Sequence, residues 1–308
     1  MKYAPMLCQK GNESILDSNA YIFEPKLDGT RCIAEVNGEI KLFNRRNRNI
    51  SRRYPFICKE LEKYGNVVFD GEIVCYNREG KPDFYLLQKR EHVDSDLIIE
   101  IRAKLIPATY VIFDILEMDG KSLVEKPLEE RKGILNEIFK KSEHLELIFM
   151  TKNGKKLWEE IRKRNMEGVI AKEMGSKYYP GERRHEWLKI KNVKSIDVII
   201  VGYTREKREI SALGMGLYKE KEIYYIGKVG TGFDEEIIRY LLKNFKETKD
   251  AYAANAEKAP SNMIWVKPEM VAEVEYIEMT KDMELRSPSF KRLRNDKKPE
   301  ECTFEQIE

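Results

Sequence analysis

The chain has 308 residues, 42% of them hydrophobic, which is enough for one large domain or two. Its 56 basic and 53 acidic side chains leave a net charge of +3, which excludes a polybasic nucleic-acid coat and limits nucleic-acid binding to local patches. No run of 18 apolar residues predicts a membrane helix, and the first residues lack the apolar core of a secretory leader, so we expect a cytoplasmic protein with no membrane partner.

The first 192 residues alternate segments typical of strands and of helices. Asn37-Gly38 separates two alternating runs in RCIAEVNGEIKLF and predicts a β-hairpin. Apolar runs predict central strands at 67–76 and 108–118 and shorter strands at 167–173 and 187–191. Helical periodicity predicts helices around 54–64, 83–91, 127–141 and 155–165. We therefore predict an α+β domain with antiparallel sheets over residues 1–192.

After Lys191 the sequence becomes richer in Ile, Val and Tyr. Strands are predicted within 196–230 and at 271–279, with one helix at about 234–247. Glycine-punctuated strands with a single helix predict a small β-barrel of the OB type over 193–308, with the boundary near 192–195. The acidic end, PEECTFEQIE, is expected to be a solvated tail. The five cysteines form no Cys-x-x-Cys pair, which favours core residues over a zinc site or a disulfide framework.

The stretch EPKLDGTR (24–31) places Lys26 at the end of a predicted strand, beside Asp28 and a glycine turn. A lysine is a nucleophile only where desolvation or nearby cations favour the neutral amine. Arg31, Lys189 and Lys191 could supply those cations, and Asp28 could position the amine or take a proton. Taken alone, the string is more often an ordinary lysine at a strand end beside a turn.

Four later segments can likewise be interpreted either as functional motifs or as ordinary structural elements. FDGEIV (69–74) could be only a buried strand, Phe113 a core residue, WLKIK (187–191) a solvated strand and RLRNDK (292–297) a basic turn. Functionally, Lys189 and Lys191 lie two apart on one strand face and could hold a phosphate. Glu167 suits Mg²⁺, and Phe113 could stack on a purine. The order of these strings along the chain favours the functional interpretation.

KLDG resembles the nucleotidyl-transfer motif shared by ATP-dependent DNA ligases, RNA ligases and mRNA-capping enzymes, and the later strings follow in the order of that superfamily. The stretch GKVGTGF (227–233) and the chain length are similar to minimal two-domain DNA ligases, in particular the ligase domain of bacterial and archaeal end-joining ligases. The resemblance implies an adenylation (nucleotidyltransferase, ATP-grasp-like) domain at 1–192 and an OB-fold domain with the acidic tail at 193–308. It also implies ATP as substrate, AMP carried on lysine, and Mg²⁺ or Mn²⁺.

The resemblance assigns a role to each matching residue. Lys26 is the expected nucleophile and Asp28 its positioning acid, while Gly29 lets the backbone turn. The expected nucleotide contacts are Glu24 (adenine amino group), Arg31 (ribose or nick), Arg45 and Glu72 (ribose), Phe113 (adenine stacking), Lys172, Lys189 and Lys191 (phosphates), Arg294 and Lys297 (pyrophosphate), and Arg183, with Glu167 and Glu72 as metal ligands. FNRRNRN departs from the ligase pattern, which has a small turn residue near Asn47, so Arg46 remains an alternative to Arg45.

The resemblance implies three-step sealing of 3′-hydroxyl/5′-phosphate nicks in DNA repair or end joining by a nucleoid-associated monomer. The expected partners are nicked or broken double-stranded DNA and a Ku-like end-binding protein. Two alternatives remain: an RNA ligase or GTP-using capping-type enzyme with the same lysine motif, and a non-catalytic OB-type nucleic-acid-binding protein.

Overall fold

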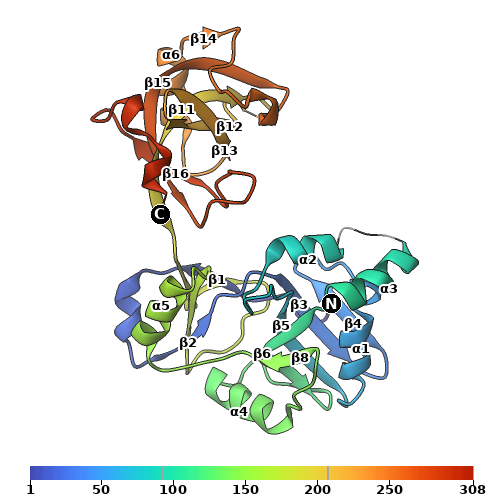
Figure 1. Cartoon of the computed structure of the whole chain (residues 1–308). Helices are drawn as coiled ribbons and strands as arrows, with labels where there is room; N and C mark the ends of the chain where they lie inside the picture. The colour runs from blue at the N-terminus through green and yellow to red at the C-terminus, as the bar shows by residue number, and fades with distance from the viewer. Residues whose placement is uncertain (92, 94, 207, 308) are drawn as a thin grey trace. The chain divides into compact units, whose positions relative to one another are not determined.

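A computed structural model describes residues 1–307 except 92, 94 and 207, and divides the chain into two compact units, Met1–Asn192 and Val193–Glu308 (Figure 1). Within these described residues, no helix is long and apolar enough to cross a membrane. The helices of the first unit are α1 (Pro55–Leu61), α2 (Phe84–Glu91), α3 (Asp96–Leu105), α4 (Leu128–Ile138) and α5 (Gly154–Lys163). Its strands are β1 (Leu7–Lys10), β2 (Tyr21–Pro25), β3 (Thr30–Val36), β4 (Ile40–Asn44), β5 (Val67–Val74), β6 (Thr109–Met118), β7 (Lys121–Ser122), β8 (Leu145–Leu147), β9 (Gly168–Glu173) and β10 (Arg183–Lys191).

The first unit contains two sheets that share a buried face. One has the order β1-β10-β9-β2, and the other has the order β4-β3-β5-β6-β7, with β8 beside β6. Trp187 of β10 packs with Val68 and Val111 of the second sheet, so apolar residues of both sheets form one core. Helices α1, α2 and α4 cover the opposite face of the larger sheet, and α5 covers the opposite face of the smaller one (Figure 1).

Alternation along the strands sends polar side chains to the same buried face. In β2 Phe23 packs toward α5, so its neighbour Glu24 points the other way, toward the larger sheet. In β3 Cys32 packs toward the helices, so Arg31 points toward the smaller sheet. The space between the sheets therefore receives charged residues from both, which apolar packing alone does not explain.

Most of the predicted elements are confirmed. The Asn37-Gly38 hairpin joins β3 and β4 with Val36 opposite Ile40. The four predicted helices correspond to α1, α2, α4 and α5, whereas α3 was not predicted. The α+β class with mainly antiparallel sheets is also confirmed, with parallel pairing at β1–β10 and β6–β8.

The second unit is a curved sheet that encloses its own core. Its strands are β11 (Lys194–Thr204), β12 (Ala212–Lys219), β13 (Glu222–Val229), β14 (Glu247–Thr248), β15 (Met263–Tyr276) and β16 (Ser289–Leu293), and its helix is α6 (Glu235–Asn244). The strand order is β13-β12-β11-β15-β14, with β16 on β15. Asp234 caps α6 by accepting the backbone N–H groups of Glu236 and Ile237.

The prediction of a solvated acidic tail is wrong. Cys302 is fully buried in the core of the second unit, and its carbonyl accepts the backbone N–H of Tyr218 at 2.7 Å. Phe304 packs edge-on against Tyr224. The Gln306 side chain donates to the carbonyl of Asp197 at 3.1 Å and accepts its N–H at 3.3 Å. Two apolar anchors and these paired bonds outweigh the hydration of the acidic residues between them.

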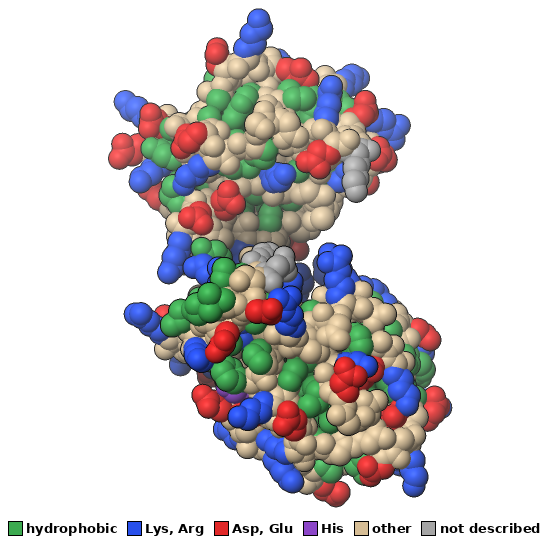
Figure 2. All heavy atoms as spheres, turned by 90° about the vertical axis from the view of Figure 1, so that its right-hand side faces the viewer, with side chains coloured by type: hydrophobic (Ala, Val, Ile, Leu, Met, Phe, Trp, Pro, Cys, Tyr) green, Lys and Arg blue, Asp and Glu red, His purple; other side chains and the backbone are tan. Residues whose placement is uncertain are grey.

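The surface carries both charges together. Figure 2 shows basic and acidic side chains interspersed over the visible face of each unit, in keeping with the small net charge. On this face, therefore, no side chains of a single charge gather into a large patch.

Candidate active site

A cavity of about 770 Å³ in the first unit is lined by residues of both sheets. Its wall includes three acidic side chains, Glu24, Glu72 and Glu91, and nine basic ones: Lys26, Arg31, Arg45, Arg46, Arg48, Arg53, Lys172, Arg183 and Lys189. This excess of positive charge suits a ligand with several negative charges. Phe113 and Trp187 add an aromatic wall, which suits a flat ring in the same ligand.

Lys26 is held at both its backbone and its side chain. Its backbone N–H donates to the carbonyl of Gly168 at 2.8 Å, and its Nζ lies 2.6 Å from Oε1 of Glu167. Gly168 has a φ of +150°, and a Cβ there would lie 2.1 Å from the carbonyl oxygen of Ile190. Only glycine lets β9 approach β10 this closely, while the pairing of β2 with β9 and the backbone bond from Lys26 to Gly168 hold Glu167 beside Lys26.

The turn after Lys26 also requires its glycine. A Cβ on Gly29 would lie 2.3 Å from the carbonyl oxygen of Ile73 in β5, so the close approach is to the neighbouring strand. Asp28 is half-buried beside it and does not line the cavity.

Glu24 lies between two buried lysines. Its exposed fraction is 2%; Oε1 accepts from Lys132 of α4, and Oε2 lies 2.7 Å from Nζ of Lys172. Burial alone would raise the pKa of Glu24, but the charges of Lys132 and Lys172 hold that pKa below its ordinary value. Glu24 is therefore an ionised carboxylate in the cavity wall. Lys132 was not predicted, because nothing in its helix distinguishes it from a solvated lysine.

Arg31 is paired within the protein. Its guanidinium donates twice to the carboxylate of Asp70, at 2.6 Å each, and Asp70 also accepts from the hydroxyl of Tyr178 at 2.7 Å. Asp70 is fully buried, so this two-bond ion pair fixes the position of the Arg31 guanidinium, and Arg31 also lines the cavity. Asp70 was not predicted as a site residue, although it lies within FDGEIV.

Phe113 lines the cavity with 7% of its surface exposed, and cations lie against its ring. Nζ of Lys172 is 4.0 Å from the centroid of Phe113 and 4.1 Å from that of Trp187. The guanidinium of Arg31 is 4.6 Å from the Phe113 centroid. This packing favours cation–π attraction, while burial lowers the pKa of Lys172 despite the opposing effect of Glu24.

Glu72 and Glu167 are the carboxylates predicted to bind a metal. Burial raises the pKa of Glu72 to about 7, against the opposing charges of Arg31 and Lys26. Across the described part of the chain, no three His, Cys, Asp or Glu side chains gather into a metal cluster. Mg²⁺ is usually held by one or two carboxylates plus waters and substrate phosphates, so this donor set fits it.

The loop after β4 carries four arginines to the cavity: Arg45, Arg46, Arg48 and Arg53. The side chain of Asn44 accepts the backbone N–H groups of Arg46 and Arg48, at 3.0 and 3.1 Å. Asn47 has a φ of 57°, a left-handed conformation that asparagine tolerates. Asparagine therefore serves where the ligase pattern has a small turn residue. Arg45 and Arg46 both line the cavity, so either could be the predicted ribose contact.

The predicted nucleotide-binding residues of β10 divide into two groups. Lys189 and Arg183 of β10 line the cavity, and burial together with the charges of Arg183 and Lys191 lowers the pKa of Lys189. Lys191 lies two residues after Lys189 and so on the same face of β10, but it is exposed to solvent and does not line the cavity.

Arg294 and Lys297 belong to the second unit, where they share one partner. Arg294 donates to both oxygens of Asp197 at 3.0 and 3.1 Å, and Nζ of Lys297 lies 2.6 Å from Oδ2 of the same carboxylate. Asp296 also accepts from Arg294, at 2.9 Å. Asp197 begins the apolar part of β11, and its role was not predicted.

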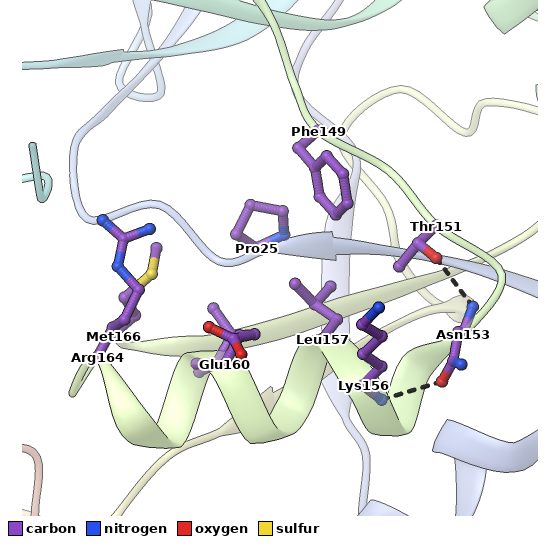
Figure 3. A pocket seen from close by; sticks show the side chains of 10 residues that line it. Pro25, Phe149, Thr151, Asn153, Lys156, Leu157, Glu160, Arg164 and Met166 are labelled. Carbon is purple, nitrogen blue, oxygen red and sulfur yellow. Dashed lines mark hydrogen bonds between the residues drawn. The ribbon is translucent and has the colours of Figure 1, made fainter.

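A second cavity of about 390 Å³ lies beside α5 and contains none of the predicted site residues (Figure 3). Pro25, Phe149 and Leu157 point toward one another across it (Figure 3). Asn153 bonds to Thr151 and caps the N–H of Lys156, at 3.0 Å each, so these polar groups serve the helix start. Its apolar wall does not suit a phosphate-bearing ligand.

Family comparisons agree with this geometry. The family model described as "ATP dependent DNA ligase domain" matches residues 5–191, and that described as "ATP dependent DNA ligase C terminal region" matches residues 206–297. A multifunctional non-homologous end joining protein LigD of Mycolicibacterium smegmatis is 31% identical, over 98% of this chain and 40% of that relative. A DNA ligase of Thermococcus onnurineus is 31% identical, over 98% of this chain and 57% of that protein. The chain thus spans less than two thirds of these relatives.

Solved structures give the same result. The crystal structure of the ligase domain from M. tuberculosis LigD matches with a TM-score of 0.56 and 29% identity, over 98% of both chains. Mycobacterial DNA ligase D complexed with ATP and MES matches with a TM-score of 0.58 and 29% identity, again over 98% of both. The predicted fold class, a nucleotidyltransferase domain followed by an OB-fold domain, is confirmed.

Proposed function

Because the chain belongs to the family of ATP-dependent DNA ligases, we propose that it seals 3′-hydroxyl/5′-phosphate nicks in DNA through a lysyl-AMP intermediate. The observation that carries this proposal is the placement of Lys26. Its amine lies in the wall of the basic cavity, beside the carboxylate of Glu167. A nucleotide bound there would have its phosphates among the cations and its base near Phe113, leaving the α-phosphate for Lys26.

In the first step the neutral amine of Lys26 attacks the α-phosphorus of ATP. The N–P bond forms, the bond to the bridging oxygen breaks, and pyrophosphate leaves with the electron pair, while the amine gives up a proton. Glu167, 2.6 Å from Nζ, is placed to orient the amine and to accept that proton. Arg183 and Lys189 would neutralise charge at the phosphates, and Arg294 and Lys297 would orient the pyrophosphate. Asp28 keeps its proposed role as a positioning acid.

In the second step an oxygen of the 5′-phosphate at the nick attacks the same phosphorus, and the N–P bond breaks as the leaving nitrogen takes up a proton, which returns the lysine. The 3′-hydroxyl oxygen then attacks the activated 5′-phosphorus and loses its proton to solvent, while the bond from that phosphorus to the bridging oxygen of AMP breaks. The phosphodiester bond is formed and AMP is released. Glu72 and Glu167 would hold a divalent ion, which when bound supplies charge neutralisation at the phosphates. Arg31 and Arg45 or Arg46 would contact the sugar.

The test is covalent labelling followed by sealing. The protein is incubated with α-labelled ATP or GTP and separated on a denaturing gel, and is then assayed on nicked duplexes with a DNA or RNA 3′ strand. We expect label from ATP, none from Lys26→Ala, and undiminished label from the exposed control Lys155→Ala. Preference for GTP would favour a capping-type enzyme, preference for RNA an RNA ligase, and DNA binding without label a non-catalytic OB protein.

We further propose that the cellular substrate is a broken DNA end held by a Ku-like protein, with the enzyme acting as a monomer. The support is the end-joining role printed in the names of relatives such as the M. smegmatis protein. Joining of cohesive ends, measured with and without a Ku-like protein, tests this part. Stimulation is expected for broken ends and not for nicks; equal stimulation of both would contradict it.

A further inference from the structure

A buried charge network lies behind the part of the cavity wall that Glu24 and Lys172 form. Glu24, Lys132 and Lys172 are 2%, 5% and 2% exposed, and the fully buried Asp114 forms a two-bond pair with Arg131, at 2.9 Å for each bond. Asp114 also accepts the backbone N–H of Ile115 at 2.9 Å. Asp114 is thus satisfied by partners of its own, and Glu24 is the carboxylate to which Lys132 bonds.

The two lysines beside Glu24 differ in their access to the cavity. Lys172 lines it, lies against Phe113 and Trp187, and is within reach of an incoming ligand. Lys132 projects from α4, is not part of the cavity wall, and ends on Oε1 of Glu24. A ligand phosphate can therefore compete for Lys172 but not for Lys132. Lys132 therefore keeps its bond to Glu24 when a ligand occupies the cavity.

The charge of Glu24 decides which hydrogen bonds it can make. An ionised carboxylate only accepts, whereas a protonated one can also donate. A purine with an amino group at position 6 donates there, and a 6-oxo purine accepts there. An ionised Glu24 thus matches the amino purine and leaves the 6-oxo purine facing a second acceptor, an unpaired and repulsive contact.

Building on the proposed nucleotidyl transfer, we infer that Lys132 is a specificity-determining residue that keeps Glu24 ionised and so makes the cavity select 6-amino purines over 6-oxo purines. Lys132 acts through Glu24 and is a positioning residue, since it does not touch the nucleotide. Removing its charge leaves the buried carboxylate with Lys172 as its remaining lysine partner, and protonation then relieves the cost of burial.

The experiment compares lysyl-nucleotide formation from α-labelled ATP and ITP, which differ at position 6 of the base. For Lys132→Met the ATP-over-ITP preference should fall by about tenfold or more, because ATP loses a charge-assisted bond and ITP gains a donor. Lys132→Arg should keep the wild-type preference. Lys126→Met is the matched control, since Lys126 lies just before α4 and forms an exposed pair with Glu130.

Two outcomes separate this inference from the function on which it rests. A folded Lys132→Met protein with unchanged preference overturns the inference alone. Wild-type protein that takes no label from either nucleotide overturns the proposed function and the inference with it. If Lys132→Met does not fold, Glu24→Gln/Lys132→Met removes both charges. Its glutamine both donates and accepts, so the preference should again fall, and a preserved preference would refute the selection by Glu24 through which Lys132 is inferred to act.

Discussion

Nζ of Lys26 and Oε1 of Glu167 lie 2.6 Å apart, which joins the end of β2 to the start of β9. The contact is supported by the backbone bond from Lys26 to Gly168 and by the pairing of Pro25 with Val169 in the same two strands. One carboxylate is thereby placed to orient the amine, and the proposed first step depends on it.

Glu167→Gln should slow lysyl-AMP formation by about a hundredfold, because the amide keeps the shape but cannot take a proton. The rate is measured by quenched-flow labelling with ATP. The exposed Glu159→Gln on α5 is the control and should leave the rate unchanged. Full activity of Glu167→Gln would remove Glu167 from the mechanism.

Asp70→Asn should destabilise the first unit by about 3 kcal/mol, since it leaves the buried side of Arg31 without its charge partner and weakens the Tyr178 bond. Urea unfolding measures the change. The exposed pair of Asp96 with Arg52 offers a matched control, and Asp96→Asn should produce no measurable change. Equal effects of the two substitutions would argue against a structural role for the buried pair.

Asp197→Asn should slow lysyl-AMP formation by about tenfold or more while sealing of a pre-adenylated nick continues at the wild-type rate. The reason is that Asp197 holds both Arg294 and Lys297, which are proposed to act on pyrophosphate only in the first step. Asp296→Asn removes one exposed partner of Arg294 and should have the smaller effect. A parallel loss of both activities would instead indicate a general folding defect.

Glu273 predicts a pH-dependent contribution to stability. Ser195, Lys291 and Arg292 bond to it at 2.6, 2.9 and 2.7 Å and lower its pKa to about 2, below the ordinary value of 4.5. Because the pKa of Glu273 is depressed in the folded state, its contacts contribute their full stabilisation above about pH 4.5. This contribution is lost as the pH falls through 2 and the carboxylate becomes protonated. Glu273→Gln should cost about 1–2 kcal/mol at pH 7.

Thermal unfolding of wild type and Glu273→Gln across pH 2–7 tests this prediction. The difference between the two proteins should shrink as the pH falls from 4.5 toward 2. Glu275→Gln is the control, because Glu275 has only a distant contact with Lys291, at 4.0 Å. A difference that stays constant with pH would show that the Glu273 contacts are not electrostatic.

Helices and strands could be predicted from the sequence where one face of the element is buried, because burial leaves a regular pattern of apolar residues. Asn37-Gly38 predicted its hairpin because the turn needs a positive φ, and Gly38 has a φ of 84°. Helix α3 was missed because its apolar residues are spread around the helix. Ile99 is buried, while Leu97, Ile101 and Leu105 are exposed, so no single stripe marks the segment.

The tail was misjudged for a related reason. Its acidic composition predicted hydration, but Cys302 and Phe304 each find an apolar partner that composition does not reveal. A few buried atoms decide where such a segment lies, and they can be identified only once the strands beneath it are folded.

The sequence by itself determined the family, the strand and helix types, and the order of the chemistry-bearing strings, because these depend on neighbouring residues and on spacing. Only the tertiary structure decided the partners of the charges: Arg31 with Asp70, Lys132 with Glu24, and Lys297 with Asp197, which are 39, 108 and 100 residues apart. Burial is the physical reason. A charge removed from water must be compensated within a few ångströms, and which opposite charge lies that close is decided by how the sheets and helices pack.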